Sequence, residues 1–164
     1  MREPGQYRDR ALAPTTTPDE MRELAGCPYP FVWQALATRP DVPADVLEAL
    51  MHRSDTDWNN NRLLALIARH EQANRPVLLS VLEHVQRLLA MGERPYAAGL
   101  ALASRAELTV DEASGMLTRP GGSRRFRVGL RARLSERAAS TNERPIRTAP
   151  LSGDEETASP FRVS

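Results

Sequence analysis

Apolar residues recur every three or four positions along most of the chain, in short blocks that are separated by Pro and Gly. In one block Val32, Ala35 and Leu36 lie at positions i, i+3 and i+4, a spacing that places side chains on one face of an α-helix. Blocks of this kind begin at or near Thr17, Pro30, Pro43, Asn60, Pro76, Pro95, Thr109 and Ser123. The pattern predicts an all-α fold over residues 15–137.

Two of these blocks begin with the residues that start helices in many proteins. Thr17-Pro18-Asp19-Glu20 and Thr109-Val110-Asp111-Glu112 each place Glu three residues after Thr. In such a capping box the Thr hydroxyl and the Glu carboxylate each accept a hydrogen bond from a backbone amide that the helix leaves free. We therefore expect helices to begin at Pro18 and at Val110.

The helical blocks also recur at a longer interval. Leu36, Leu66, Leu100 and Leu130 occupy similar places in the second helix of each pair, with separations of 30, 34 and 30 residues. Periods of this length are typical of α-helical repeats, in which stacking buries faces that one hairpin leaves open. The spacing predicts a short α-solenoid of about four stacked helical hairpins. An ordinary eight-helix domain would give the same pattern and stays open as the alternative.

The two ends of the chain lack this periodicity. Residues 1–14 mix Arg, Glu, Pro, Gly and Gln, and residues 138–164 are rich in Ser, Thr, Arg, Glu and Pro. Such segments carry too few apolar residues to offset the entropy lost on ordering. We expect a flexible leader over 1–14 and a disordered polar tail over 138–164.

One stretch carries a family resemblance. Residues 39–50 contain a Pro-rich turn and the helix Val46-Leu47-Glu48-Ala49-Leu50; a polar turn at 54–57 and a second helix over 61–70 follow. Residues 17–70 thereby resemble the variant leucine-rich repeats of bacterial proteins, which are related in shape to HEAT and armadillo repeats. The resemblance implies a curved scaffold with a binding groove, and it implies no reaction. Some members hold a cysteine-bound iron–sulfur cluster, which a chain with the single cysteine Cys27 cannot do.

Composition narrows the function further. The net charge is +1, and all 22 basic residues are Arg, which binds carboxylates and phosphates in a bidentate manner. No secretory signal, long apolar run, metal-binding spacing or catalytic motif is recognisable, so we expect a cytoplasmic protein that is not an enzyme and needs no cofactor or metal. A G+C-rich genome would also explain the exclusive use of Arg.

Trp58 is the most unusual apolar residue of the chain. It lies in the polar run Asp55–Asn61, where a role in the core is unexpected. Trp is enriched among residues that dominate binding interfaces. We predict that Trp58, Arg62 and Arg69 contact a partner, and the alternative is that Trp58 covers one end of the stack.

The strongest concentration of charge lies in residues 123–137. Arg124, Arg125, Arg127, Arg131 and Arg133 fall in this segment, and Arg124, Arg127 and Arg131 share one helical face. This face is either the solvated outer surface of a terminal helix or a stripe that binds nucleic acid or an acidic protein segment. The sequence therefore favours an adaptor that binds another protein in its groove, and nucleic-acid binding through the Arg-rich helix is the alternative.

Overall fold

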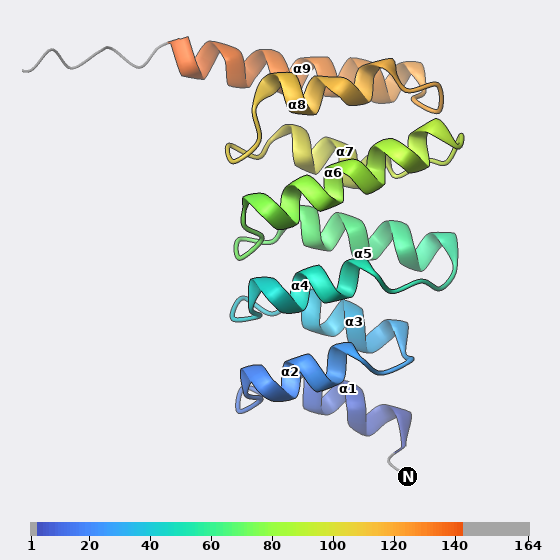
Figure 1. Cartoon of the computed structure of the whole chain (residues 1–164), viewed down its shortest axis with the longest axis vertical. Helices are drawn as coiled ribbons and strands as arrows, with labels where there is room; N and C mark the ends of the chain where they lie inside the picture. The colour runs from blue at the N-terminus through green and yellow to red at the C-terminus, as the bar shows by residue number, and fades with distance from the viewer. Residues whose placement is uncertain (1–2, 143–164) are drawn as a thin grey trace, which may run out of the picture.

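The computed structural model describes residues 3–142 of the chain, and this part is helical throughout, without a strand (Figure 1). The all-α prediction is thereby confirmed for these residues. The elements are α1 (Pro4–Leu12), α2 (Pro18–Ala25), α3 (Pro30–Ala37), α4 (Ala44–Met51), α5 (Asp57–Arg69), α6 (Arg75–Ala90), α7 (Tyr96–Ala103), α8 (Val110–Ser114), the 3-10 helix η1 (Gly115–Thr118) and α9 (Arg124–Asn142).

The two predicted capping boxes are both present. The Thr17 hydroxyl accepts from the Glu20 amide at 3.3 Å, and the Glu20 carboxylate accepts from the Thr17 amide at 2.9 Å. The corresponding distances between Thr109 and Glu112 are 3.1 and 2.7 Å. These local signals therefore fix where α2 and α8 begin.

The helices form two layers. The helices α1, α3, α5, α7 and α9, here called the odd layer, pack against one another in that order, and α2, α4 and α6 pack in order in the other layer. The helix α8 and η1 continue this second layer, here called the even layer, because η1 packs on α6 (Figure 1). Leucine, valine and alanine side chains fill the space between the layers and form one continuous core.

The turns that lead from the odd to the even layer share one hydrogen-bonding pattern. Ala13, Arg39, His70 and Arg105 each donate a backbone hydrogen bond to the carbonyl three residues earlier and accept one from the amide three residues later. The earlier partners in the last three turns are Leu36, Ile67 and Leu102, and each of these is fully buried. The expected equivalence of Leu36 with Leu66 and Leu100 is therefore wrong, because those two leucines are displaced by one and two positions and lie half-exposed.

Three arginine side chains bind the turn that precedes them in the chain. The Arg39 guanidinium, only 7% exposed, donates to the carbonyls of Ala11 and Ala13, at 3.0 and 2.6 Å. Arg105 and Arg137 bind the turns that precede them in the same way. The acceptors are Ala68, His70 and Ala73 for Arg105, and Ala103 and Leu108 for Arg137. Each guanidinium thus satisfies carbonyls that the end of an odd-layer helix leaves without intrahelical partners.

Both ends of the described chain differ from expectation. Residues 4–12, part of the expected leader, form α1, whose Ala11 is completely buried and which packs against α3. Packing against α3, which sequence periodicity cannot reveal, supplies the stabilisation that a short polar helix lacks alone. At the other end α9 continues to Asn142, beyond the expected boundary at 137, and the remainder of the expected tail lies outside the described residues.

Candidate functional site: an arginine-lined groove on the odd layer

Three adjoining hollows run across the outer face of the odd layer. The first, of about 460 Å³, lies over α1, α3 and α5; the second, of about 410 Å³, lies between α5 and the start of α7; the third, of about 600 Å³, lies over α5, α7 and α9. Arg62 and Leu66 line both the first and the second, and Arg69 and Ala97 line both the second and the third. The shared residues join the hollows into one continuous surface, here called the groove.

The helix α5 supplies the central row of the groove. Trp58, Arg62, Leu66 and Arg69 follow one another at steps of three or four residues, so they share one face of the helix. Trp58 is 65% exposed, and the Arg62 guanidinium lies over its ring, 5.5 Å from the ring centroid. The opposite face of α5, with Ile67 at its centre, is buried in the core. All three residues predicted to bind a partner therefore line the same hollow.

Trp58 does not lie at an end of the molecule. The helix α5 packs between α3 and α7, so its exposed side chains face outward from the middle of the odd layer. The alternative in which Trp58 covers the end of the stack is therefore wrong. An indole of this exposure in mid-molecule leaves a large apolar surface in contact with solvent.

Each odd-layer helix contributes one row of side chains to the groove, and rows that contain Arg alternate with rows that are neutral. The lining residues of α1, α5 and α9 include Arg8, Arg62, Arg69 and Arg133. The lining residues of the two helices between them are neutral: Phe31, Gln34, Ala35 and Thr38 from α3, and Tyr96, Ala97, Leu100, Ala101 and Ser104 from α7. Arg94, just before α7, adds one more cation at the edge. Within the part of the chain that the structure describes, no Asp or Glu lines the three hollows.

The arginines of the groove are not used to hold the fold together. Among residues 3–142, Arg8, Arg62, Arg69, Arg94 and Arg133 form no ion pair, and their guanidinium groups donate no hydrogen bond. By contrast Arg105, which also lines the third hollow, binds both the preceding turn and the carboxylate of Glu107. The other five guanidinium groups can therefore bind an anionic ligand.

The two layers carry opposite charge. The odd-layer helices contain ten Arg and three acidic residues, whereas α2, α4, α6 and α8 contain three Arg and eight acidic residues. The net charge of the whole chain, +1, conceals this separation. A field of this kind attracts an anionic ligand toward the groove and repels it from the opposite face.

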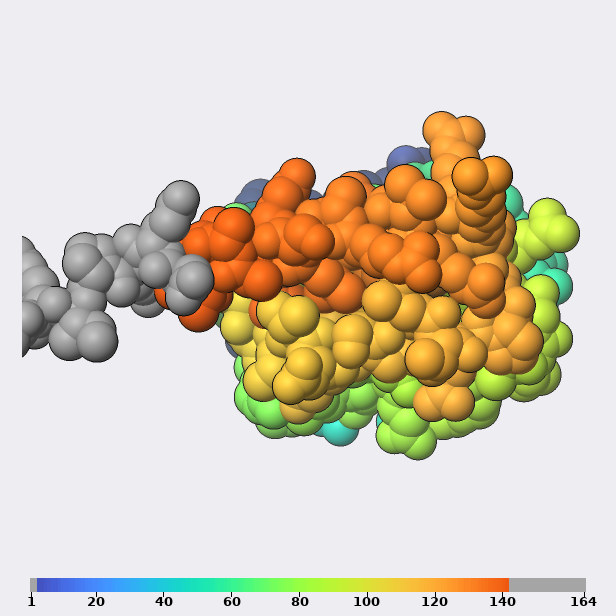
Figure 2. Space-filling view, turned by 90° about the horizontal axis from the view of Figure 1, so that it is seen from above, coloured from blue at the N-terminus to red at the C-terminus, as the bar shows by residue number. Residues whose placement is uncertain are grey.

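The Arg-rich helix at the end of the chain divides its side chains among three roles. Arg133 lines the groove, whereas Arg127 donates to the carbonyl of Arg119 at 3.0 Å and so fastens α9 to the preceding turn. Arg124, Arg125 and Arg131 are exposed. Seen from the end, α9 and α8 cover the molecule, and side chains of α9 project from it (Figure 2). The predicted stripe of Arg124, Arg127 and Arg131 is therefore not available as a unit, because Arg127 is committed to a backbone carbonyl.

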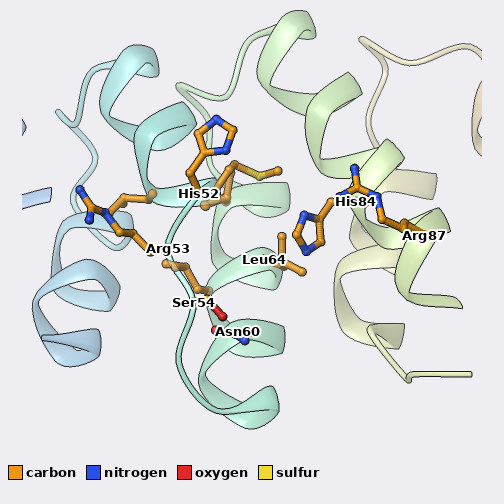
Figure 3. Close-up of a pocket in the computed structure, with 11 residues that line it drawn as sticks. His52, Arg53, Ser54, Asn60, Leu64, His84 and Arg87 are labelled. Carbon is orange, nitrogen blue, oxygen red and sulfur yellow. The ribbon is translucent and has the colours of Figure 1, made fainter. Parts of the chain in front are cut away.

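A separate cavity of about 270 Å³ lies between α4, α5 and α6. Leu50, Leu63, Leu64 and Ile67 form its apolar wall, and His52, Arg53, Ser54, His84 and Arg87 lie at its rim. Figure 3 shows the His84 ring beside Leu64, with Arg53 and Arg87 extending on opposite sides. Burial, aided by the nearby Arg87, lowers the pKa of His84 and so favours its neutral form. The polar groups do not converge on one point, and no carboxylate of the described residues lines the cavity to orient His84 as a base.

Cys27 is a buried side chain in the turn before α3. The indole nitrogen of Trp33 donates to the Cys27 carbonyl at 2.7 Å, and burial raises the pKa of the thiol. The thiol form that burial favours is not the nucleophilic thiolate. Within residues 3–142, no three His, Cys, Asp or Glu side chains are grouped so that they could hold a metal ion.

The sequence identified part of the groove and missed the rest. Arg62, Arg69, Trp58 and Arg133 were expected to bind a ligand, but Arg133 was grouped with the Arg-rich helix. Arg8, Arg94, Phe31 and Leu100 were not expected at the site. Arg8 belongs to a segment that was not predicted to fold, so it was not expected at the site.

Comparison of the chain with protein-family models, with curated proteins and with solved structures found no match. In the part of the chain that the structure describes, no helix has both the length and the apolar character needed to cross a bilayer.

Proposed function

We propose that the protein is a non-enzymatic adaptor, built as a short α-solenoid of the variant leucine-rich or HEAT-like kind, which binds another protein in the groove of its odd layer. The observation that carries this function is the groove itself: a continuous surface with exposed Trp58 on which, among residues 3–142, five arginines form no ion pair and no carboxylate lies. Large exposed apolar side chains among cations favour recognition of a protein surface over simple solvation.

The recurring turns support the solenoid part of the proposal. Ala13, Arg39, His70 and Arg105 have the same backbone hydrogen bonds, at separations of 26, 31 and 35 residues. A structure in which each pair of helices contacts chiefly its neighbours is the arrangement that defines helical repeats. The unequal separations reflect helices of different length, since α6 has 16 residues and α4 has 8.

Binding without catalysis is supported by the chemistry of the hollows. The groove combines guanidinium, amide, hydroxyl and apolar groups, none of which serves as a general base at neutral pH, and Cys27 is buried away from it. The cavity beside His84 is lined by two imidazoles and the Ser54 hydroxyl, but no carboxylate of residues 3–142 lines it to orient an imidazole as a base. We therefore assign binding, and no reaction, to this chain.

Nucleic-acid binding is the second candidate function. Arg124, Arg125 and Arg131 are exposed on the terminal helix and form no ion pair among the described residues. Arg127, between them, donates its hydrogen bond to the Arg119 carbonyl and is not free to bind a phosphate. This weakens the candidate, because contiguous contacts to phosphates supply most of the affinity in such proteins.

An affinity capture with matched variants tests the proposed function. The tagged full-length protein, the groove variant Arg62→Glu/Arg69→Glu and the end-helix variant Arg124→Glu/Arg131→Glu are each incubated with native lysate, with and without nuclease. We expect proteins that resist nuclease and are lost only with the groove variant. If nuclease abolishes capture, or if only the end-helix variant loses it, the groove is not the binding site. Nucleic-acid binding through the Arg-rich helix would then be the better account.

A further inference from the structure

The alternation of charged and neutral rows specifies what kind of protein segment the groove accepts. The charged rows of α1, α5 and α9 are separated by the neutral rows of α3 and α7. Axes of packed helices lie about 8–10 Å apart, so a ligand that crosses the groove meets a new row at each such step. It meets a guanidinium at every second step, about 16–20 Å apart.

The polyproline II conformation matches this spacing. It has three residues per turn and rises about 3.1 Å per residue, so residues i, i+3 and i+6 point to the same side at intervals of about 9 Å. A β-strand of similar length turns residue i+3 to the opposite side, because its side chains alternate. An extended ligand in the polyproline II conformation therefore places every third side chain on the next helix of the odd layer.

The side chains in each row then determine which type of residue the ligand needs at every third position. Guanidinium groups such as Arg62 and Arg69 pair with carboxylates in a bidentate manner, and they lie on the central row. The neutral rows offer Phe31 and Leu100, whose exposed carbons favour an apolar side chain. The row order thus corresponds to acidic, apolar, acidic, apolar and acidic residues at i, i+3, i+6, i+9 and i+12.

A nucleic-acid strand fits this order less well. Duplex DNA carries one phosphate charge per about 1.7 Å of its axis, and so places anions opposite the neutral rows as well as the charged ones. Phosphates opposite Phe31, Ala35, Ala97 and Leu100 would lie against carbon atoms and lose hydration there, and only arginines at the sides of these rows could reach them. Sparse charge separated by apolar residues is a property of polypeptide.

We propose, on the basis of the proposed adaptor function, that the groove binds an acidic protein segment in the polyproline II conformation, with acidic residues six positions apart and apolar residues midway between them. The segment crosses all five odd-layer helices and spans about 13 residues. Trp58 and Tyr96, which line the second hollow, provide aromatic surface for the prolines that stabilise this conformation.

Two synthetic peptides of equal composition test the register. The peptide EPSLPSEPSLPSE has acidic and apolar residues at the proposed positions, and EEELLPSPSPSPS has the same residues out of register. Binding of the fluorescently labelled peptides to the full-length protein is measured by anisotropy at low salt. We expect the first peptide to bind at least about tenfold more tightly than the second, because only it satisfies charged and neutral rows together. Equal affinities, or no binding of the first peptide, would overturn the register.

Charge-reversal variants locate the peptide on the protein. Arg62→Glu and Arg133→Glu should each weaken binding of the first peptide by about two- to fivefold, the cost of a lost surface ion pair. Arg124→Glu, on the same terminal helix as Arg133 but outside the groove, should leave binding unchanged. All three positions are at least partly exposed, and circular dichroism checks that the variants fold. A loss with Arg124→Glu and none with Arg62→Glu would overturn the proposed site.

A third probe separates failure of this inference from failure of the adaptor function. Oligothymidylate of 20 nucleotides is added as a competitor of the bound peptide. One outcome is that the oligonucleotide displaces the labelled peptide at a lower concentration than the unlabelled peptide does, with an affinity that falls steeply with salt. That result would show that the ligand of the groove is a nucleic acid and not an acidic protein segment. The lysate experiment can instead give a nuclease-resistant partner whose capture depends on Arg62 and Arg69, while neither peptide binds. In that case the groove is the binding site of a protein, and the polyproline II ligand is wrong.

Discussion

Gly121 shows how closely single residues are fitted at the end of the molecule. Its amide donates to the Leu89 carbonyl at 2.8 Å, so the turn before α9 lies directly against the end of α6. A Cβ atom at this position would overlap the same Leu89 carbonyl oxygen and approach the Cα of Gly92 within 3.1 Å. These obstacles are backbone atoms, which cannot move aside as a flexible side chain can.

We expect Gly121→Ala to destabilise the protein by about 1–3 kcal/mol, the usual cost of overpacking. Gly5→Ala is the matched control: no atom lies within 4 Å of the added carbon, and the residue is helical, so this change should be neutral or stabilising by up to about 1 kcal/mol. Urea unfolding followed by circular dichroism measures both. Equal stabilities of the two variants would contradict the tight approach of the turn to α6.

At the scale of the helical elements, buried arginines join one turn to the next. Arg39 combines two hydrogen bonds to the preceding turn with a bidentate pair to Asp41, at 2.9 and 2.7 Å, and this pair lowers the pKa of Asp41. Arg105 repeats the arrangement with Glu107. The same Arg-x-acid pattern thus recurs at two of the turns.

Arg39→Met should lower the free energy of unfolding by about 2–4 kcal/mol, because it leaves buried carbonyls without donors. Arg22→Met provides the control. Arg22 also pairs with carboxylates, Asp19 and Asp45, but it is exposed, and its loss should cost no more than about 1 kcal/mol. Thermal and urea unfolding of both variants measure the difference. A change at Arg39 no larger than at Arg22 would show that the buried guanidinium does not join the turns.

The contact between α6 and α8 gives the fold a dependence on pH. The Arg75 guanidinium binds the Glu112 carboxylate in a bidentate manner, at 2.6 and 3.1 Å, and together with the Thr109 amide lowers the pKa of Glu112 from 4.5 to about 2. Since the pKa is lower in the folded state, the contribution of Glu112 is complete above pH 4.5 and is lost as the pH falls toward 2.

We therefore expect the melting temperature of the wild type to fall more steeply between pH 4.5 and 2 than that of Glu112→Gln. Glutamine keeps an acceptor for the Thr109 amide and removes only the titrating charge. Glu48→Gln, at an exposed position without an ion pair among residues 3–142, should follow the wild-type curve. Parallel curves for the wild type and Glu112→Gln would contradict the role of this pair.

The sequence revealed what is determined locally. The capping boxes at Thr17 and Thr109 depend on residues three positions apart, and helical faces depend on neighbours three or four apart, so both were predicted correctly. The helix α1 was missed because its stability comes from α3 and from Arg39, about 28 residues further along. The groove was recognised only where one helix, α5, carries several of its residues; Arg8 and Arg94 reach it through the packing of helices far apart in sequence.

At the scale of the whole molecule, the separation of charge between layers distinguishes this chain from a uniformly solvated helical protein. Ten of the arginines belong to odd-layer helices, and eight acidic residues belong to even-layer helices. The separation is consistent with one face that is specialised for an anionic partner. The proposed function therefore predicts that partner contacts gather on the odd layer and are absent from the even layer.

Site-specific photo-crosslinking tests that central claim most directly. A photoreactive amino acid is placed at position 66, in the middle of the groove, or at position 48, on the exposed face of α4 in the even layer. Both full-length proteins are irradiated in nuclease-treated native lysate. The proposal predicts a discrete crosslinked protein from position 66, lost when Arg62 and Arg69 are changed to Glu, and none from position 48. Crosslinking that is equal at the two positions, or stronger at position 48, would contradict the assignment of the groove as the binding face.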